Sequence, residues 1–180
     1  MVEVSFAEVR GRLRELVRGE YREFLRNFKR SIRVARLLNQ RRLVVLCGRD
    51  NLKLAGLSAE LIIRYLKEFR SKPRVGKGES IRVLYFYHDE LPDSTSRARL
   101  VRKVLKHFLK SLDKVRVEPE FVVYEKSHKY LGATVQVLVL DLLDDLRPNY
   151  IGRLLGIVEG GGLIIPVSYT HLRAHETVLD

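Results

Sequence analysis

Short apolar runs that alternate with helical segments are the feature of this sequence that most constrains its fold. The runs LVVLCG, IRVLYFY, EFVVY, VQVLVLDL and GLII follow one another between residues 42 and 165. Several are separated by segments with apolar residues every three or four positions: LSAELIIRYLKEF, SRARLVRKVLKHFLKSL and PNYIGRLLGIVEG. Strands that are apolar on both faces are typical of parallel sheets covered by helices on both sides. We therefore expect a three-layer α/β domain over residues 42–165, with a mostly parallel five-stranded sheet and Rossmann-like topology.

The first forty residues carry a helical pattern instead. Apolar residues recur at helical spacing in two sets, before and after Gly19: Phe6, Val9, Leu13, Leu16 and Val17, then Phe24, Phe28, Ile32, Ala35 and Leu38. We expect two basic helices over residues 1–41 that pack on the sheet. Their arginines form either a solvated face or an arm that follows an RNA backbone, and the two interpretations are compatible. Ser58 is the expected N-cap of the next helix.

Positive charge is concentrated in parts of the chain. The formal net charge is +12 and the pI is about 10.0. Residues 1–42 hold 12 Lys/Arg against 5 Asp/Glu, and further clusters lie at 70–80 and 96–114. Such clustering favours a polyanionic partner, with nucleic acid as the default; the alternative is a generally basic or thermophilic surface. The predicted phosphate contacts are Arg10, Arg14, Arg22, Lys29, Arg33, Lys72, Arg74, Lys77, Arg102, Lys103 and Lys106.

Other classes of protein are disfavoured. Cys47 is the single cysteine, so neither an internal disulfide nor a multi-cysteine metal site is expected. No apolar run approaches the length of a membrane span, and the charged N-terminus has no secretory h-region. We expect a cytoplasmic protein.

Several glycine-rich motifs resemble phosphate-binding loops. Gly160, Gly161 and Gly162 follow a helix and precede a strand, the reverse of the order that a phosphate loop needs, so we expect a helix C-cap and turn. VGKGES at 75–80 lacks the Walker A spacing. LCGRDN at 46–51 follows a strand but offers one glycine, which is a weak signal for a nucleotide contact.

Carboxylates follow the fourth predicted strand. Asp141, Asp144 and Asp145 could hold Mg²⁺ there, although loop solubility and helix capping are the favoured interpretation. The histidines show no spacing that indicates a catalytic triad or a metal site: His88, His107 and His128 are scattered, while His171 and His175 fall near the end of the chain. Cys47 is expected in the core.

One stretch carries a family resemblance. YEKSHKYLGATVQVLVLDLLDDLRPNYIGRLLGIVEGGGLII resembles the N-terminal domain of the tRNA(Met) cytidine acetyltransferase family. The matching positions are Leu131, Gly132, Thr134, Asp141, Pro148, Asn149, Gly152, Gly160, Gly161 and Gly162. The likeness is specific over these residues and looser from residue 1, and the charge-rich composition resembles archaeal members.

The resemblance implies a function for a longer protein. Members of this family use acetyl-CoA and ATP to acetylate a cytidine in the anticodon of elongator tRNA(Met), through ATPase and acetyltransferase domains that follow this one. It implies a non-catalytic domain that contacts tRNA and supports those domains, with no cofactor of its own. The alternatives are a stand-alone basic α/β nucleic-acid-binding protein, or a small nucleotide-dependent enzyme that uses GRDN and the Asp141–Asp145 loop.

The last fifteen residues have a different character. PVSYTHLRAHETVLD lacks a clear amphipathic stripe, and Pro166 is expected to interrupt the preceding strand. The segment resembles translated adaptor sequence. We expect residues 166–180 to be a non-native tail on a truncated domain.

Overall fold

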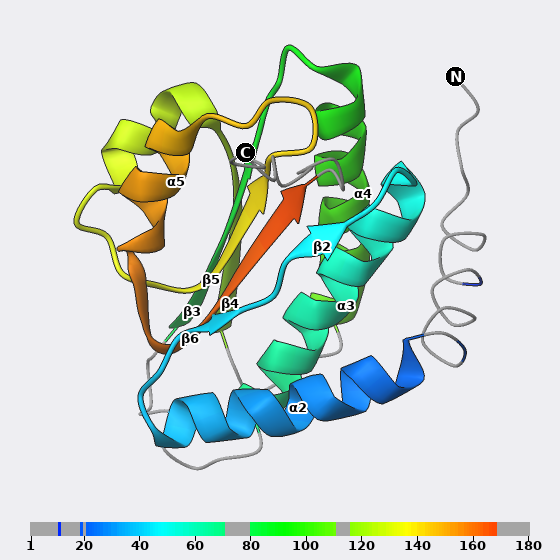
Figure 1. Ribbon diagram of the computed structural model, residues 1–180, viewed down its shortest axis with the longest axis vertical. Helices are drawn as coiled ribbons and strands as arrows, with labels where there is room; N and C mark the ends of the chain where they lie inside the picture. Colours follow the sequence, from blue (N-terminus) through cyan, green and yellow to red (C-terminus); the bar gives the residue numbers. More distant parts are fainter. Residues whose placement is uncertain (1–10, 12–18, 20, 71–79, 111–115, 169–180) are drawn as a thin grey trace, which may run out of the picture.

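The computed structural model describes residues 11, 19, 21–70, 80–110 and 116–168. The elements, shown in Figure 1, are α2 (Arg22–Leu37), β1 (Arg42–Leu43), β2 (Leu46–Cys47), α3 (Asn51–Arg70), β3 (Ser80–Tyr87), α4 (Pro92–Leu109), β4 (Arg116–Val123), the 3-10 helix η1 (Tyr124–Tyr130), β5 (Val135–Asp141), α5 (Pro148–Leu155) and β6 (Val158–Ser168). None of the described helices combines the length and hydropathy of a membrane span.

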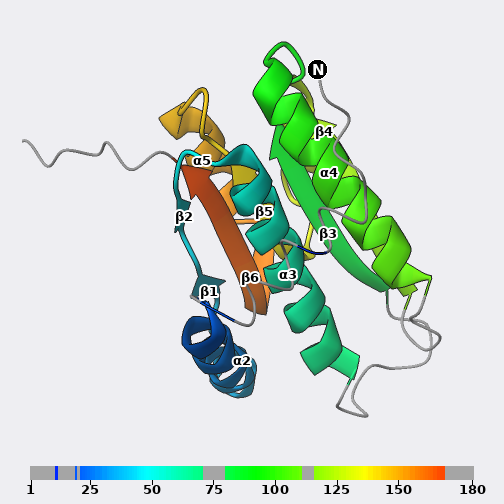
Figure 2. The ribbon, with the colours of Figure 1, turned by 90° about the vertical axis from the view of Figure 1, so that its right-hand side faces the viewer.

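The strands form one parallel sheet between two helical layers, as the apolar runs predicted. Its order is β1-β6-β5-β3-β4, and β2 also pairs with β6. Alternate β5 residues enter two cores: Val137 and Val139 pack with α3 and α4, while Leu138 and Leu140 pack with α5 and η1. Figure 2 shows α3 and α4 together on one side of the sheet. The three-layer α/β prediction is confirmed.

The helix α2 lies across the end of the sheet where the strands begin (Figure 1). It buries Leu25, Phe28, Ile32 and Ala35. The sequence predicted Phe24 in place of Leu25, but Phe24 is 39% exposed, because the buried stripe starts one position later. The first predicted helix lies outside the described residues.

The first predicted strand is broken in two, and Pro166 explains the break. β1 and β2 pair with β6 in the same register on either side of the gap. This register places Val45 opposite Pro166, whose ring nitrogen has no hydrogen to donate. The prediction that Pro166 interrupts its own strand is wrong, since β6 continues to Ser168. The predicted boundary at 165 thus falls inside β6, and the foreign origin of the tail stays a prediction.

The three glycines lie within β6 and not at a helix C-cap, so that prediction is wrong. α5 is capped by Gly156. Gly161 has a φ of 82°, donates its N–H to the Gln40 carbonyl at 2.9 Å and accepts the Tyr65 hydroxyl at 3.1 Å. A Cβ at Gly160 would lie 2.2 Å from Asn39 Oδ1. The glycines therefore let the connection between α2 and β1 lie directly against the strand.

Two predicted helix starts also differ from the structure. α3 begins at Asn51, and the predicted N-cap Ser58 is buried inside the helix, where its hydroxyl donates to the Leu54 carbonyl at 2.8 Å. The capping contact comes from Asp50, whose side chain accepts the Lys53 N–H at 3.0 Å. α4 begins at Pro92, because proline suits the first helical turn.

Candidate functional site

The carboxyl ends of β3 and β5 form the topological switch point of the sheet. These neighbouring strands lead away in opposite directions, β3 through α4 to β4 and β5 through α5 to β6. Open parallel sheets bind their ligands in the crevice outside such a point. The residues gathered there decide whether this chain can hold a nucleotide.

Arg97 from α4 fills this position. Its side chain is 1% exposed, and its guanidinium donates from Nε to Asp141 Oδ2 and from Nη2 to Asp141 Oδ1, both at 2.9 Å. It also donates to Asp144 Oδ2. Tyr85 and Ser94 add hydroxyl bonds to Asp141 Oδ2 at 3.3 and 3.2 Å. The cluster is a bidentate, fully buried ion pair with supporting hydroxyls.

Arg97 also connects the Asp141–Asp145 loop to the GRDN segment. Its Nη1 donates to Asn51 Oδ1 at 2.6 Å, at the start of α3. The structure thus brings together the two segments that the sequence singled out for a nucleotide-dependent enzyme. They meet through a protein side chain that occupies the space between them.

The electrostatics of the cluster match a structural role. Burial raises the pKa of the Asp141 carboxyl, and the hydrogen bonds and charge of Arg97 oppose that shift. Burial, followed by the charge of Asp141, raises the pKa of the Tyr85 phenol well above its ordinary value. Asp145 forms a separate ion pair with Arg147 at 2.7 Å. With all three carboxylates bound to arginines, the loop does not fit Mg²⁺, and no described group of His, Cys, Asp or Glu suits a metal ion.

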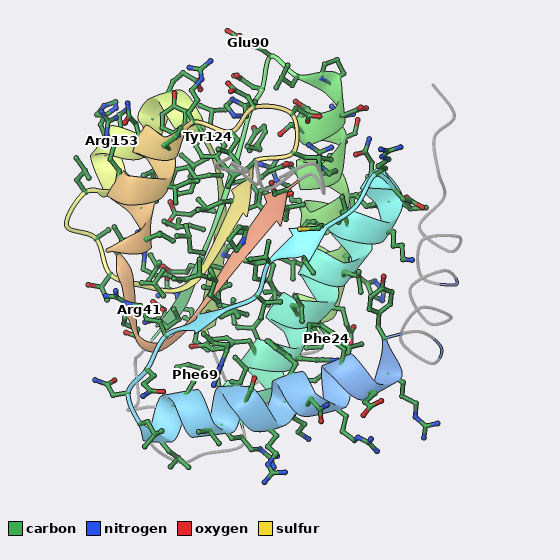
Figure 3. The ribbon with its side chains drawn as sticks, viewed as in Figure 1. Phe24, Arg41, Phe69, Glu90, Tyr124 and Arg153 are labelled. Carbon is green, nitrogen blue, oxygen red and sulfur yellow. The ribbon has the colours of Figure 1, made fainter. Side chains whose placement is uncertain are left out.

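An aromatic cluster borders the switch point on the α5 side. His88 is 5% exposed, and its ring lies 4.5 Å from that of Tyr124, which stacks at 4.7 Å on Tyr150. Tyr124 lies between the α5 layer and the upper ends of the strands (Figure 3). Its buried hydroxyl has no hydrogen-bond partner among the described residues. The sequence did not predict this cluster, because His88, Tyr124 and Tyr150 are far apart in the chain.

Cys47 and the other described histidines are not members of the Arg97 cluster or of the aromatic cluster. Cys47 is exposed, so its predicted core position is wrong. His128 bonds its own turn at the Glu125 carbonyl, and His107 is exposed on α4. His171 and His175 lie outside the described residues.

The predicted RNA-contacting cations divide into two described surfaces. On α2, Lys29 and Arg33 both bind Glu68 of α3, at 3.2 and 2.5 Å, and Arg22 is exposed at the helix start. Burial alone would raise the pKa of Glu68, but the hydrogen bonds and charges of Arg33 and Lys29 together lower it. Two of the α2 cations therefore share one buried carboxylate within the fold.

The cations of α4 are not compensated in this way. Arg99, Arg102, Lys103 and Lys106 are exposed, as is Lys110 directly after the helix. Residues 94–112 contain no Asp or Glu. None of these five cations forms an ion pair within the described part of the chain. We call them the α4 cationic face. The other predicted contacts, Arg10, Arg14, Lys72, Arg74 and Lys77, lie outside the described residues.

The residues that carry the family resemblance do not form one site. Leu131, Gly132 and Thr134 make the turn before β5, where Gly132 has a φ of 81°. Pro148 and Asn149 start α5, and Gly152 lies on its exposed side. Asp141 lies at the opposite end of β5 from that turn. These positions fix turns, helix starts and close contacts of the backbone.

Comparison with known proteins agrees with the resemblance. Residues 14–171 match the family model described as tRNA(Met) cytidine acetyltransferase TmcA, N-terminal. The relative from Thermofilum pendens, a tRNA(Met) cytidine acetyltransferase, is 35% identical over 156 residues, which cover 87% of this chain and 17% of the relative. Relatives with the same name from Saccharolobus islandicus and Pyrococcus furiosus are 35% and 37% identical over 113 and 131 residues, covering 63% and 69% of this chain.

The matched segments span 12% and 15% of those two relatives, so this chain corresponds to a small part of each relative's length. The family model, in contrast, covers most of the chain, including β6 to its end. This chain therefore belongs to the family of N-terminal domains of tRNA(Met) cytidine acetyltransferases.

Proposed function

We propose that this chain is the non-catalytic N-terminal domain of an ATP-dependent tRNA(Met) cytidine acetyltransferase, in which it contacts tRNA and supports the other domains. The observation that carries the tRNA contact is the α4 cationic face, whose charges have no acidic partner in the described fold. Uncompensated Lys and Arg on one helix are the electrostatic footprint of phosphate binding.

Catalysis by the described residues has no support in the geometry. A nucleotide at the switch point would have to displace Arg97 from Asp141, a buried and doubly bonded pair. ATP with Mg²⁺ and acetyl-CoA are therefore proposed for the full-length enzyme, to be bound by its other domains. A cytoplasmic location and an archaeal source stay predictions.

Support for the other domains is proposed from the outer edge of the sheet. The side chains of Leu43 in β1 and of Val45, in the gap between β1 and β2, are 56% and 53% exposed. Leu37 at the end of α2 and Leu38 directly after it are 70% and 60% exposed. Exposed apolar side chains that gather in one region mark interaction surfaces. We assign this edge to contact with the remainder of the enzyme.

Binding of elongator tRNA(Met) to the purified chain tests the main proposal, by fluorescence anisotropy over a range of KCl concentrations. We expect binding at low salt, and a triple variant R99Q/K103Q/K106Q should lower the salt slope by about two to three, because each lost phosphate contact removes slightly less than one. The control K29Q/R33Q should lower it less for each charge removed, since the Glu68 carboxylate holds both side chains and offsets one of their two charges. Absence of binding at low salt would contradict a direct tRNA role.

The stand-alone nucleic-acid-binding protein is the alternative. It shares the α4 cationic face but requires no preference for elongator tRNA(Met). Equal affinity for this tRNA, an unrelated tRNA and duplex DNA of matched charge would favour it.

A further inference from the structure

A groove runs between α4 and the edge strand β4. Its volume is about 650 Å³, and it is lined by Arg102, Lys106, Leu109, Lys110, Pro119 and Phe121. Figure 2 shows α4 lying along β3 and β4 at this edge of the sheet. Because side chains of a strand alternate between its faces, Pro119 and Phe121 point to the same side, towards α4.

The wall that α4 contributes is positively charged. Arg102, Lys106 and Lys110 follow one another at intervals of four, which places them along one side of the helix. The acidic residues of β4 are directed elsewhere: Glu120 binds Arg82 and Tyr130, and Glu118 binds Arg116. The groove thus combines three cations with no carboxylate in its lining.

One of these cations is already held in position. The Arg102 guanidinium lies over the Phe121 ring, 4.6 Å from its centroid, and that ring stacks at 5.3 Å on Tyr85. Tyr85 is itself fixed by its bond to Asp141. A guanidinium that is stacked in advance loses less conformational freedom when it binds a phosphate.

The floor of the groove has a different chemistry. Leu109, Pro119 and Phe121 supply apolar surface directly beside the cations. A volume of about 650 Å³ lies in the range of sites that enclose a small organic group. A nucleotide, which joins a phosphate to a flat base, has the chemistry to fill both parts.

We propose that this groove binds an unpaired nucleotide of the RNA, with its phosphate on Arg102, Lys106 and Lys110 and its base on the apolar floor. The inference rests on the proposed tRNA contact and deepens it. In an A-form duplex the bases are stacked inside the helix and only the backbone can reach the cations. An unpaired nucleotide can place its base in the groove, where contact with Phe121 and with the guanidinium stacked on it adds affinity.

Competition between defined RNAs tests the proposal, with the 180-residue chain and labelled elongator tRNA(Met) as the displaced ligand. A single-stranded 12-mer should compete about fivefold or more better than a duplex with the same number of phosphates. F121L should remove this preference and keep duplex affinity, whereas the control K103Q, outside the groove, should weaken both competitors equally. Equal competition by the two RNAs, or an unchanged preference in F121L, would overturn the groove site while leaving tRNA binding intact.

A second measurement is independent of how well F121L folds. Ultraviolet cross-linking of single-stranded oligouridine to the wild-type chain should place the adduct on the peptide that contains Pro119 and Phe121. Adducts confined to other peptides would overturn the proposal. Failure of every RNA to bind at low salt would instead refute the proposed tRNA contact itself.

Discussion

Arg97 shows how one residue can decide the chemistry of a sheet edge. The position where related sheets hold a ligand is occupied by its guanidinium, which binds Asp141, Asp144 and Asn51. The sequence predicted the carboxylates at the strand end, but it indicated for Arg97 no role beyond that of one cation among many on a basic helix. A signal was present, because Arg97 lies four residues before Val101 and eight before Leu105, on the stripe that faces the core.

Removing Arg97 should be severe. R97M leaves the buried Asp141 carboxylate without its ion pair, and we expect the free energy of unfolding to fall by about 3–5 kcal/mol. The double variant R97M/D141N should recover part of this loss, since the amide carries no charge and still accepts the Tyr85 and Ser94 hydroxyls. Urea unfolding measures both values. If the double variant is no more stable than R97M, the unpaired charge of Asp141 is not the cause of the lost stability.

Two buried tyrosines should respond in opposite ways to loss of the hydroxyl. Tyr124 has no hydrogen-bond partner in the described structure, so Y124F should leave stability unchanged or raise it. Y85F loses the bond to Asp141 and should cost about 1 kcal/mol. Thermal unfolding of the two variants gives the comparison. A larger loss for Y124F than for Y85F would reveal a partner for the Tyr124 hydroxyl.

At the scale of elements, the sheet was predictable and its details were not. Continuous apolar runs such as VQVLVLD identify buried parallel strands because both faces are covered. The break between β1 and β2 depends on Pro166, more than a hundred positions away, and therefore on the register of the finished sheet. The start of α3 was missed because its cap, Asp50, stands inside a motif that also resembled a ligand loop.

The glycines of β6 and α5 give a matched test at this scale. G161A places a Cβ at positive φ and 3.3 Å from the Arg36 backbone, so it should cost about 1–2 kcal/mol or more. G152A, in the interior of α5 with no atom within 4 Å, should instead stabilise by about 0.5–1 kcal/mol. Thermal unfolding distinguishes them. A G161A variant as stable as wild type would contradict the close contact between α2 and β6.

The contact between α2 and α3 should make stability depend on pH. The pKa of Glu68 is lowered in the folded state from its ordinary value of 4.5, so its stabilising contribution is full above that value. The contribution is lost as the pH falls through the lowered folded pKa. We expect E68Q to flatten the acid limb of a stability–pH profile measured by urea unfolding. An acid limb that is unchanged in E68Q would assign the pH dependence to other carboxylates.

On the scale of the whole molecule, the charge distribution was predicted only in outline. Clusters of Lys and Arg were evident from the sequence, but which of them are compensated depends on tertiary neighbours. Lys29 and Arg33 bind Glu68, which lies 39 and 35 positions further along the chain. The groove between α4 and β4, in contrast, has no acidic side chain in its lining. Among the predicted contacts that the structure describes, those of α4 therefore form the stronger candidate RNA surface.

The outer edge strand should govern self-association. If Leu43 and Val45 normally contact the rest of the enzyme, the isolated chain should associate as its concentration rises. L43S/V45S should reduce that association without a matching change in stability, because both side chains are largely exposed. Light scattering coupled to gel filtration measures the effect. A wild-type chain that stays monomeric at high concentration would contradict this role for the edge.

The pairing of β1 with β6 joins residue 42 to residue 163, so the first strand of the sheet is completed by the last. A growing chain that leaves the ribosome can form β3, β4 and β5 while α2 and β1 still lack their neighbour. Such sequence-distant contacts slow folding and leave apolar surface open until late. The sheet can be completed only after β6 has been synthesised. In a longer protein, the emergence of the following segment would then coincide with the closing of the sheet on which it is proposed to rest.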